Sequence, residues 1–286
     1  MLVIGDVMTD VVVRLEAPIA RGSDTAARIV ERPGGSAASF AVHLARFGIE
    51  VDFVARVGAG DVERLTAEFS ALGVSAWLTG DAERPTGRLV AVVEPSGERS
   101  FLTDRGANDA LAVVDIPEAA LARADWLHLT GYTFQAPGPR AAALAAMARV
   151  RAVSVDPGSA APLRAMGAEN FLRWTALAAV LLPNADEAAA LAESDDPEIQ
   201  RAQLGARYPL VVIKRGAAGA EVLSGERRWS APSPEVRVVD TTGAGDAFAA
   251  AFVAAHLSGA ETEACLARAV VAGAMATRFL GGRPTG

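Results

Sequence analysis

The stretch over residues 243–246 holds the residue types best suited to chemistry in this sequence. Glycine at Gly243 and Gly245 lets backbone amides converge on an anion, and a following helix adds the positive end of its dipole. A carboxylate beside such a site repels phosphate, so Asp246 makes most sense as a general base that takes a proton from an attacking hydroxyl. The backbone of Gly243, Ala244 and Gly245 would then form an anion hole. From the turn alone, a helix that Asp246 merely caps is an equally good explanation.

Other sites of known chemistry find little support in the sequence. The letters GAGD also occur at residues 58–61, but an ordinary amphipathic segment follows them instead of a helix of small residues. Neither G-x-x-x-x-G-K-[ST] nor a G-x-G-x-x-G between a strand and a helix is present, which weakens Walker-type and dinucleotide-binding hypotheses. His43, His128, His256 and the single Cys265 are isolated in apolar segments, so we expect packing roles rather than a zinc site.

Composition and charge exclude several classes of partner. The net charge of −7 and the scattered basic residues provide no field that would hold a nucleic-acid backbone. The first residues read directly as a strand with no positively charged leader, and apolar runs fall short of the roughly 18 residues that cross a membrane. We therefore expect a cytoplasmic protein that does not bind membranes and acts on small molecules.

The elements that must position the glycine turn are legible in the sequence. Short β-branched runs alternate with alanine-rich segments of helical period, a pattern typical of a parallel sheet covered by helices. The predicted core strands are residues 2–4, 51–54, 126–129, 152–155, 179–182 and 210–214. The predicted helices are residues 36–47, 139–151, 186–193, 245–257 and 261–279. A further strand, from Val236, is predicted to lead into the turn.

Two segments, residues 11–32 and 86–103, break this rhythm and read as hairpins. In the second, GRLVAVVEPSGERSF contains two strands joined by a Pro-Ser-Gly turn. Such hairpins do not fit a βαβ unit and suit a small β-sheet that stands off the main body as a lid. Because no repeat or low-complexity linker divides the chain, we expect one domain over residues 1–286. The predicted fold is α/β, a doubly wound, mostly parallel sheet flanked by helices with that β lid.

Ordered motifs along the chain resemble the ribokinase-like family of carbohydrate kinases, also called the phosphofructokinase-B type. They are GDVMTD near the N-terminus, PGGSAASFAVHLARFG from Pro33, LLPNADEAAAL from Leu181 and VVIKRGAAGA from Val211, followed by DTTGAGD with AFAAAF. The resemblance therefore covers nearly the whole chain. It implies an ATP-dependent kinase whose lid covers a sugar.

The resemblance implies a substrate site beside the lid. Asp10 matches the family aspartate that grips sugar hydroxyls, and an ionised carboxylate can accept two such hydrogen bonds. The alternative for Asp10 is a polar residue that ends a strand. Gly34 and Gly35 match the di-glycine where the backbone approaches the sugar, although a plain turn before a helix also explains them. Arg105 is either a contact for a substrate carboxylate or phosphate, or a surface ion-pair partner.

The resemblance also assigns a nucleotide site. Asn184 and Glu187 match the family's N-x-x-E element, which positions magnesium and phosphate largely through water. Asn184 could also cap its helix, and both roles are compatible. The further residues beside the nucleotide are Lys214, Gly216, Gly219, Ala272 and Gly273. A solvated strand end at Lys214 and close helix packing at Ala272 and Gly273 are the alternatives.

Two departures from the family pattern bear on the substrate. The asparagine that usually follows the second glycine by four residues is Ser39 here, and the asparagine that ribokinases tend to carry two residues before the substrate aspartate is Met8. Unmet polar groups cost roughly 1–3 kcal/mol each, so we expect ribose to be a poor substrate.

The expected activity is ATP-dependent phosphorylation of a hydroxyl on a sugar or sugar acid, with ATP and Mg²⁺ as cofactors. By resemblance, Asp240 and Thr242 occupy a loop that holds a monovalent cation such as K⁺, and a homodimer would form through the lid. The alternatives are a nucleoside kinase of the same family, a catalytically silent sugar-binding protein and, least supported, a dinucleotide-dependent oxidoreductase.

Overall fold

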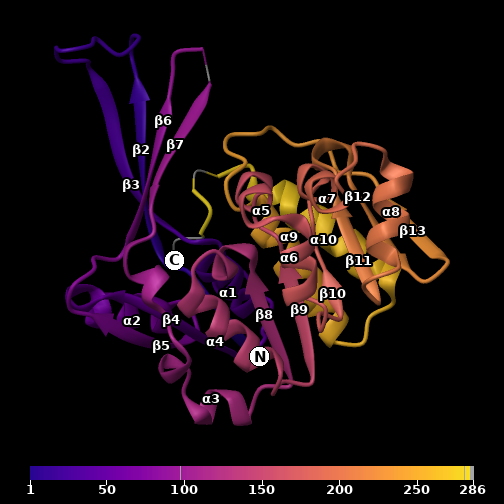
Figure 1. The fold of residues 1–286 in the computed structure, drawn as a ribbon. Coiled ribbons are helices and arrows are strands. Elements are labelled where there is room, and N and C mark those ends of the chain that lie inside the picture. Colours follow the sequence, from indigo (N-terminus) through magenta and orange to yellow (C-terminus); the bar gives the residue numbers. More distant parts are fainter. Residues whose placement is uncertain (97, 280, 284–286) are drawn as a thin grey trace.

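A sheet of nine strands forms the body of the protein, in a computed structural model that describes residues 1–96, 98–279 and 281–283 (Figure 1). Seven strands run parallel in the order β11-β10-β9-β8-β1-β4-β5, and β12 and β13 extend one edge in antiparallel pairing. The strands are β1 (Leu2–Ile4), β4 (Val51–Gly58), β5 (Val74–Asp81), β8 (Trp126–Thr130), β9 (Ala152–Asp156), β10 (Val180–Leu181), β11 (Leu210–Lys214), β12 (Ala220–Ser224) and β13 (Arg227–Ala231).

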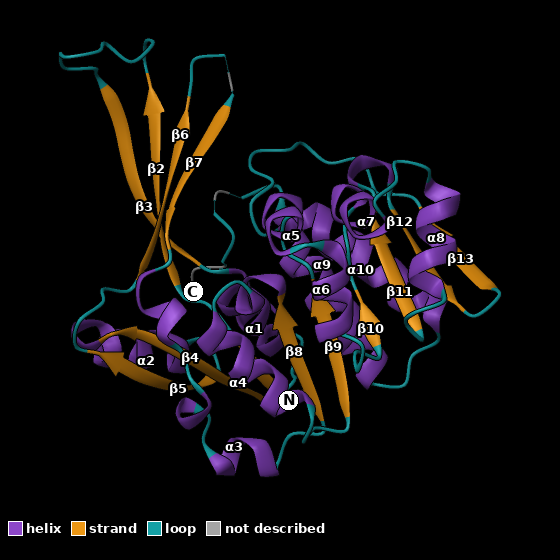
Figure 2. Ribbon diagram, viewed as in Figure 1, coloured by secondary structure: helices purple, strands orange, loops and turns teal. Residues whose placement is uncertain are grey.

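The inner strands are continuous apolar runs because helices cover both faces of the sheet (Figure 2). Every residue of β8 is buried, as are the first four residues of β11. On one face lie α1 (Ser36–Arg46), α2 (Val62–Ala71), α9 (Ala244–Leu257) and α10 (Thr262–Ala276). On the other lie α3 (Glu118–Ala122), α4 (Pro137–Met147), α5 (Ala160–Met166), α6 (Ala168–Trp174), α7 (Ala185–Ala192) and α8 (Pro197–Gly205). The predicted doubly wound α/β class is confirmed.

A second sheet of four strands stands off this body (Figure 1). Its order is β3-β2-β6-β7, built from β2 (Met8–Leu15), β3 (Ala27–Gly34), β6 (Gly87–Val93) and β7 (Arg99–Asp104). Two antiparallel hairpins, β2–β3 and β6–β7, join through the parallel pair β2–β6. The predicted small β-sheet is therefore confirmed, with strands that extend slightly beyond residues 11–32 and 86–103. We call it the lid sheet below.

The strand predicted from Val236 is wrong. Val238 and Val239 are 58% and 44% exposed, and the segment pairs with no strand of the described chain. The backbone amides of Val239 and Asp240 instead donate to the carbonyl oxygen of Thr277, just after α10. The β-branched residues after Val236 form an extended connector and not a strand, because the edge strands of the large sheet are β13 and β5 and neither pairs with them. The two hydrogen bonds to Thr277 attach this connector, and the glycine turn that follows it, to the end of α10.

Helix α9 owes its position to its small residues. Nine consecutive residues, 247–255, are buried, so the helix is apolar on all sides and lies between α1, α10 and the sheet. Cys265 is a buried free thiol in α10, as predicted. His128 is also in the core, where its ring stacks on Phe40 with 3.5 Å between ring centroids. Within the described ranges, no helix is long and apolar enough to span a bilayer.

Candidate active site

The glycine turn lies where α9 begins. Gly243 adopts φ 75°, a left-handed conformation that disfavours other residues, and caps the helix. A Cβ at this position would lie 2.3 Å from the carbonyl oxygen of Gly282, so the turn and the end of the chain are in close contact. In the first turn of this helix of 14 residues, the Ala244 amide donates to the carbonyl oxygen of Thr241 at 3.2 Å, whereas within the described residues the amides of Gly245 and Asp246 have no backbone acceptor. Unpaired amides at the start of a helix are the arrangement that binds anions.

Asp246 is partly buried at the head of this helix. Its Oδ1 accepts a 2.6 Å hydrogen bond from Oγ of Ser36, the first residue of α1. Burial raises the pKa of Asp246 well above its ordinary value, the Ser36 hydrogen bond opposes that rise, and the charge of Asp156 adds to it. A carboxylate with a raised pKa beside an anion site has the properties of a general base.

Lys214 places a buried cation against the same turn. It ends β11, its Nζ lies 2.5 Å from Oδ2 of Asp156, and a Cβ at Gly245 would be 3.5 Å from that Nζ. Burial favours the neutral amine, but the charges of Asp156 and Glu187 outweigh it and raise the pKa of Lys214. Lys214 is therefore not a solvated strand end. It stays charged beside the amides of Gly245 and its neighbours.

Asn184 and Glu187 form a reciprocal cap at the start of α7, next to Lys214. Asn184 Oδ1 accepts from the Glu187 amide at 2.9 Å, and both Glu187 carboxylate oxygens accept from Asn184, at 2.8 and 2.6 Å. Burial raises the pKa of Glu187 to about 7. Because the cap already uses both carboxylate oxygens, these residues fit a magnesium ion held through water rather than by direct ligation. The described residues contain no group of three His, Cys, Asp or Glu side chains arranged to hold a metal.

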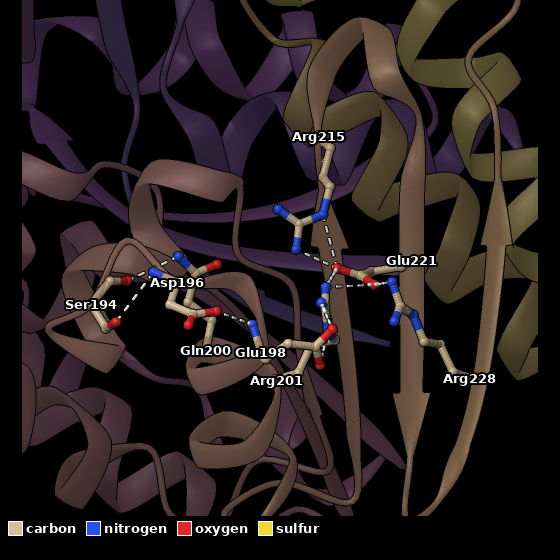
Figure 3. Close-up of polar contacts among 8 residues, drawn as sticks. All are labelled: Ser194, Asp196, Glu198, Gln200, Arg201, Arg215, Glu221 and Arg228. Atoms are coloured by element: carbon tan, nitrogen blue, oxygen red, sulfur yellow. Dashed lines mark hydrogen bonds and ion pairs between the residues drawn. The ribbon is translucent and has the colours of Figure 1, made fainter.

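The segment after Lys214 is fixed by an ion-pair cluster (Figure 3). Glu221 of β12 is 2% exposed and pairs with Arg215, with Arg201 at 3.2 Å and with Arg228 at 2.8 Å. Gly216 and Gly219 follow Arg215 at φ 56° and 94°. At Gly219 a Cβ would lie 2.0 Å from the carbonyl oxygen of Ala231, so this glycine is required by a close backbone contact. The cluster thus ties Arg215, at the start of the loop predicted to meet the nucleotide, to β12.

Ala272 and Gly273 lie on α10 near the turn. A Cβ at Gly273 would be 3.2 Å from both the carbonyl oxygen of Ala244 and the Cβ of Phe248, so this glycine lets α10 approach the head of α9. Ala272 lines a separate groove between α1, α9 and α10. Close helix packing accounts for Gly273, and the adenine contact stays a prediction.

A cavity of about 440 Å³ lies between the lid sheet and the segment that precedes the glycine turn. Asp10 lines it from β2, and Asp240, Thr241, Thr242 and Gly281 form the opposite wall. A Cβ at Gly34, on the neighbouring strand, would lie 2.2 Å from Asp10 Oδ1, so glycine there makes room for the carboxylate. Asp10 thus lines the same cavity as the residues that precede the glycine turn.

Burial, then the charge of Asp6, raises the pKa of Asp10 to about 6. Asp10 is ionised above that pH and becomes protonated below it, so it loses capacity to accept hydrogen bonds from hydroxyls as the pH falls through about 6. We expect the KM for the acceptor to rise at least several-fold between pH 7 and pH 5, measured in initial rates. In Asp10→Asn the KM should be high at every pH and lack this step. A flat KM profile in the parent would contradict the assigned role.

The other predicted substrate residues lie around this cavity without lining it. Gly35 has φ 94° and caps α1, where the carbonyl oxygen of Asp6 would lie 2.5 Å from a Cβ. Ser39 is 2% exposed within α1. Arg105 pairs through Nε with Asp109 at 3.1 Å and lies 3.9 Å from Asp6, so it has carboxylate partners within the chain. Its contact with substrate stays a prediction.

Three residues that complete the site are absent from the sequence-based assignment. Asp6 follows β1 and accepts a 3.1 Å hydrogen bond from the Ala37 amide, Ser36 contacts Asp246, and Asp156 pairs with Lys214. Asp6 and Asp156 both stand at the carboxyl ends of buried parallel strands, a position that commonly serves ligands in open α/β sheets. That placement was readable in the sequence, whereas the Ser36 contact spans 210 residues and had no local signal.

Asp240 joins the glycine turn to the end of the chain. Its Oδ1 accepts from the amide and hydroxyl of Thr242 at 3.1 and 2.8 Å, and its Oδ2 accepts from the Gly281 amide at 3.1 Å. Together these bonds fold the loop predicted for a monovalent cation into a closed turn directly before Gly243.

Comparisons with known proteins show the family of the chain. The model of the pfkB family carbohydrate kinases matches residues 1–284. The chain is 33% identical over 285 residues to an ATP-dependent ribose-1-phosphate kinase of Halopiger xanaduensis, covering 98% of this chain and 92% of the relative. It is 32% identical over 228 residues to a sugar kinase of Archaeoglobus fulgidus, covering 78% and 89%. A solved ribokinase from Thermotoga maritima superposes with a TM-score of 0.84 at 26% identity, covering 99% of this chain and 95% of the other. The chain therefore belongs to the pfkB family of carbohydrate kinases and is an ATP-dependent carbohydrate kinase.

Proposed function

We propose that this kinase transfers the γ-phosphoryl group of ATP to a hydroxyl of a sugar or sugar acid bound between the lid sheet and the glycine turn. The observation that carries the proposal is the partly buried carboxylate of Asp246 at the head of α9, which Ser36 holds by a 2.6 Å hydrogen bond beside the charged Lys214. No ordinary helix cap explains a cation and a carboxylate buried together against a glycine turn.

In the proposed reaction Asp246 accepts the proton of the acceptor hydroxyl. The hydroxyl oxygen bonds to the γ-phosphorus, the bond to the β,γ-bridging oxygen breaks, and ADP leaves. Amides of Ala244, Gly245 and Asp246, with the ammonium of Lys214, would stabilise the charge that develops on the phosphoryl oxygens and on ADP. Asp10 would orient the acceptor by accepting hydrogen bonds from its hydroxyls.

Magnesium, when bound with ATP, would neutralise charge between the phosphates. Asn184 and Glu187 would hold it through water, as their mutual cap supports. Gly216 and Gly219 would admit the phosphates and ribose, with Ala272 and Gly273 near the adenine.

A monovalent cation such as K⁺ is proposed at the loop of Asp240 and Thr242, because this carboxylate fixes the backbone directly before the anion hole. We expect replacement of K⁺ by the larger choline cation to lower turnover several-fold, measured at constant ionic strength and saturating ATP. Equal rates and equal affinity for ATP in the two salts would remove the cation from the proposal.

A homodimer through the lid sheet is supported by exposed apolar side chains on the face of that sheet that points away from the cavity. Ile29 of β3 and Leu102 of β7 are 63% and 64% exposed on that face. A partner lid would cover this apolar surface. We expect light scattering to give twice the mass of the chain, and Ile29→Asp to shift it toward the monomer. A monomeric parent protein at assay concentration would contradict the dimer.

A nucleoside is the second candidate acceptor, because the cavity also has an apolar portion that could hold a base. Its apolar lining residues are Val12, Val30, Leu89, Ala91, Val93 and Phe101. We place the reaction in the cytoplasm. ADP release measured with sugars, sugar acids and nucleosides tests the proposal. Release with no acceptor of any class would overturn it, and efficient release with ribose would refute the expectation from Ser39 and Met8.

A further inference from the structure

The face of the lid sheet that lines the cavity carries three arginines. Side chains alternate along a strand, so Asp10, Val12 and Arg14 of β2 share one face, and Arg28, Val30 and Arg32 of β3 share the same face. All six line the cavity. The register pairs Asp10 with Arg32, Val12 with Val30 and Arg14 with Arg28.

The pairing of Arg14 with Arg28 sets two like charges directly opposite each other in an antiparallel pair, an arrangement that destabilises a sheet. No ion pair within the described residues involves Arg14, Arg28 or Arg32. Although Arg32 lies opposite Asp10, its Nη1 donates to the carbonyl oxygen of Glu31 at 3.1 Å. The free protein thus keeps an unneutralised cluster of guanidinium groups over the cavity.

Charge is sorted along the cavity. Its two carboxylates, Asp10 and Asp240, lie toward the glycine turn, where both oxygens of Asp240 are already bonded to Thr242 and Gly281. Arg32 lies at this same end, opposite Asp10, whereas Arg14 and Arg28 pair at the other end. Arg14 lies four residues further along β2, about 13 Å from Asp10 along the strand, and long arginine side chains can bridge part of that span. A substrate with hydroxyls at one end and an anionic group at the other matches this order.

We propose that the acceptor carries an anionic group, a phosphate ester or a carboxylate, and that Arg14 and Arg28 bind it. This inference rests on the proposed function and names the substrate class of the same site. Guanidinium groups recognise both anions through paired N–H donors, and a bound anion removes the repulsion between Arg14 and Arg28. A neutral sugar would leave Arg14 and Arg28 opposite each other with no anion to neutralise them.

The test compares matched acceptors with ATP and Mg²⁺: ribose against ribose 1-phosphate, ribose 5-phosphate and ribonate, and fructose against fructose 1-phosphate. We expect kcat/KM for the best anionic acceptor to exceed that of its neutral partner by at least about 100-fold. The phosphate and carboxylate arms of the panel distinguish the two anions. If kcat/KM for the neutral sugars equalled that for their anionic partners, the inference would be overturned and the proposed function would still stand.

Arginine variants test whether Arg14 and Arg28 cause the preference for anionic acceptors. Arg14→Gln/Arg28→Gln should raise the KM for the anionic acceptor at least 10-fold with little change in kcat, because these residues do not touch the reacting atoms. Arg88→Gln is the matched control, since Arg88 is an exposed arginine of the same sheet that points away from the cavity beside Leu89. An equal change in both variants would mean a general loss of charge and would overturn the assignment.

A binding measurement separates the inference from catalysis. Ribose 1-phosphate and ribonate should raise the Tm of the parent protein and of Arg88→Gln but not of Arg14→Gln/Arg28→Gln, with inorganic phosphate as a control for the anion alone. If these anions raised the Tm but no acceptor of any class were phosphorylated, the anion site would be supported and the proposed function would be rejected. Absence of a shift with every anionic acceptor, together with turnover of neutral sugars, would reject the site.

Discussion

Asp246→Asn is expected to lower turnover on the best acceptor by about 10²–10⁴, or roughly 3–5 kcal/mol of barrier, while the protein folds normally. Asparagine keeps the size of the side chain and an oxygen that can accept the Ser36 hydrogen bond, but it cannot take the proton of the acceptor. Affinity for ATP should hold or rise, because the change deletes a negative charge beside the phosphates. Single-turnover rates and ATP binding measure the two effects separately. A rate within a few fold of the parent would reduce Asp246 to a helix cap.

Ser36→Ala is the matched control for Asp246→Asn. It removes the 2.6 Å hydrogen bond to Asp246 but keeps the carboxylate. Since that bond holds the pKa of Asp246 down against burial, its loss should raise the pKa further and move the acid limb of kcat to higher pH. At alkaline pH the variant should retain most of its turnover. An unchanged acid limb would show that the Ser36 bond does not tune the base.

The second large effect is expected at Lys214, which is the only lysine among the 27 lysines and arginines of the chain. Lys214→Met should lower kcat/KM for ATP by about 10² or more, because it removes the cation beside the anion hole. It should also lower the free energy of unfolding by about 3–5 kcal/mol, since the 5%-exposed side chain of Asp156 would lose its ion-pair partner. Denaturant unfolding and initial rates measure the two losses.

Two variants separate the structural part of that effect from the chemical part. Lys214→Met/Asp156→Asn should recover most of the lost stability, because no unpaired charge stays buried, but it should not recover activity. Lys214→Arg should not restore activity either, because a planar guanidinium is bulkier than the ammonium that lies close to Gly245. Activity that returned together with stability in the double variant would mean that Lys214 acts only on the fold.

The sequence by itself determined the features that are local in the chain. Short apolar runs rich in β-branched residues predicted the strands β1, β4, β8, β9, β10 and β11. Alanine-rich runs of period 3.6 predicted helices, and α1, α9 and α10 begin within one residue of the predicted positions. The glycine turn with Asp246, and the cap between Asn184 and Glu187, were also readable, because each depends on a few adjacent residues. These predictions succeeded because backbone conformation there is set by neighbours in sequence.

Only the tertiary structure decided which distant side chains meet. The contacts of Ser36 with Asp246 and of Lys214 with Asp156 join residues 210 and 58 positions apart, and they depend on strand order and helix packing. The register of β2 on β3 likewise sets Arg14 opposite Arg28. The alternation of side chains within each strand does not predict this pairing. The residues from Val236 have the composition of a strand, but the sheet offers them no edge, so they form a connector instead. Local propensity yields to tertiary context wherever pairing partners, rather than the residues themselves, determine the structure.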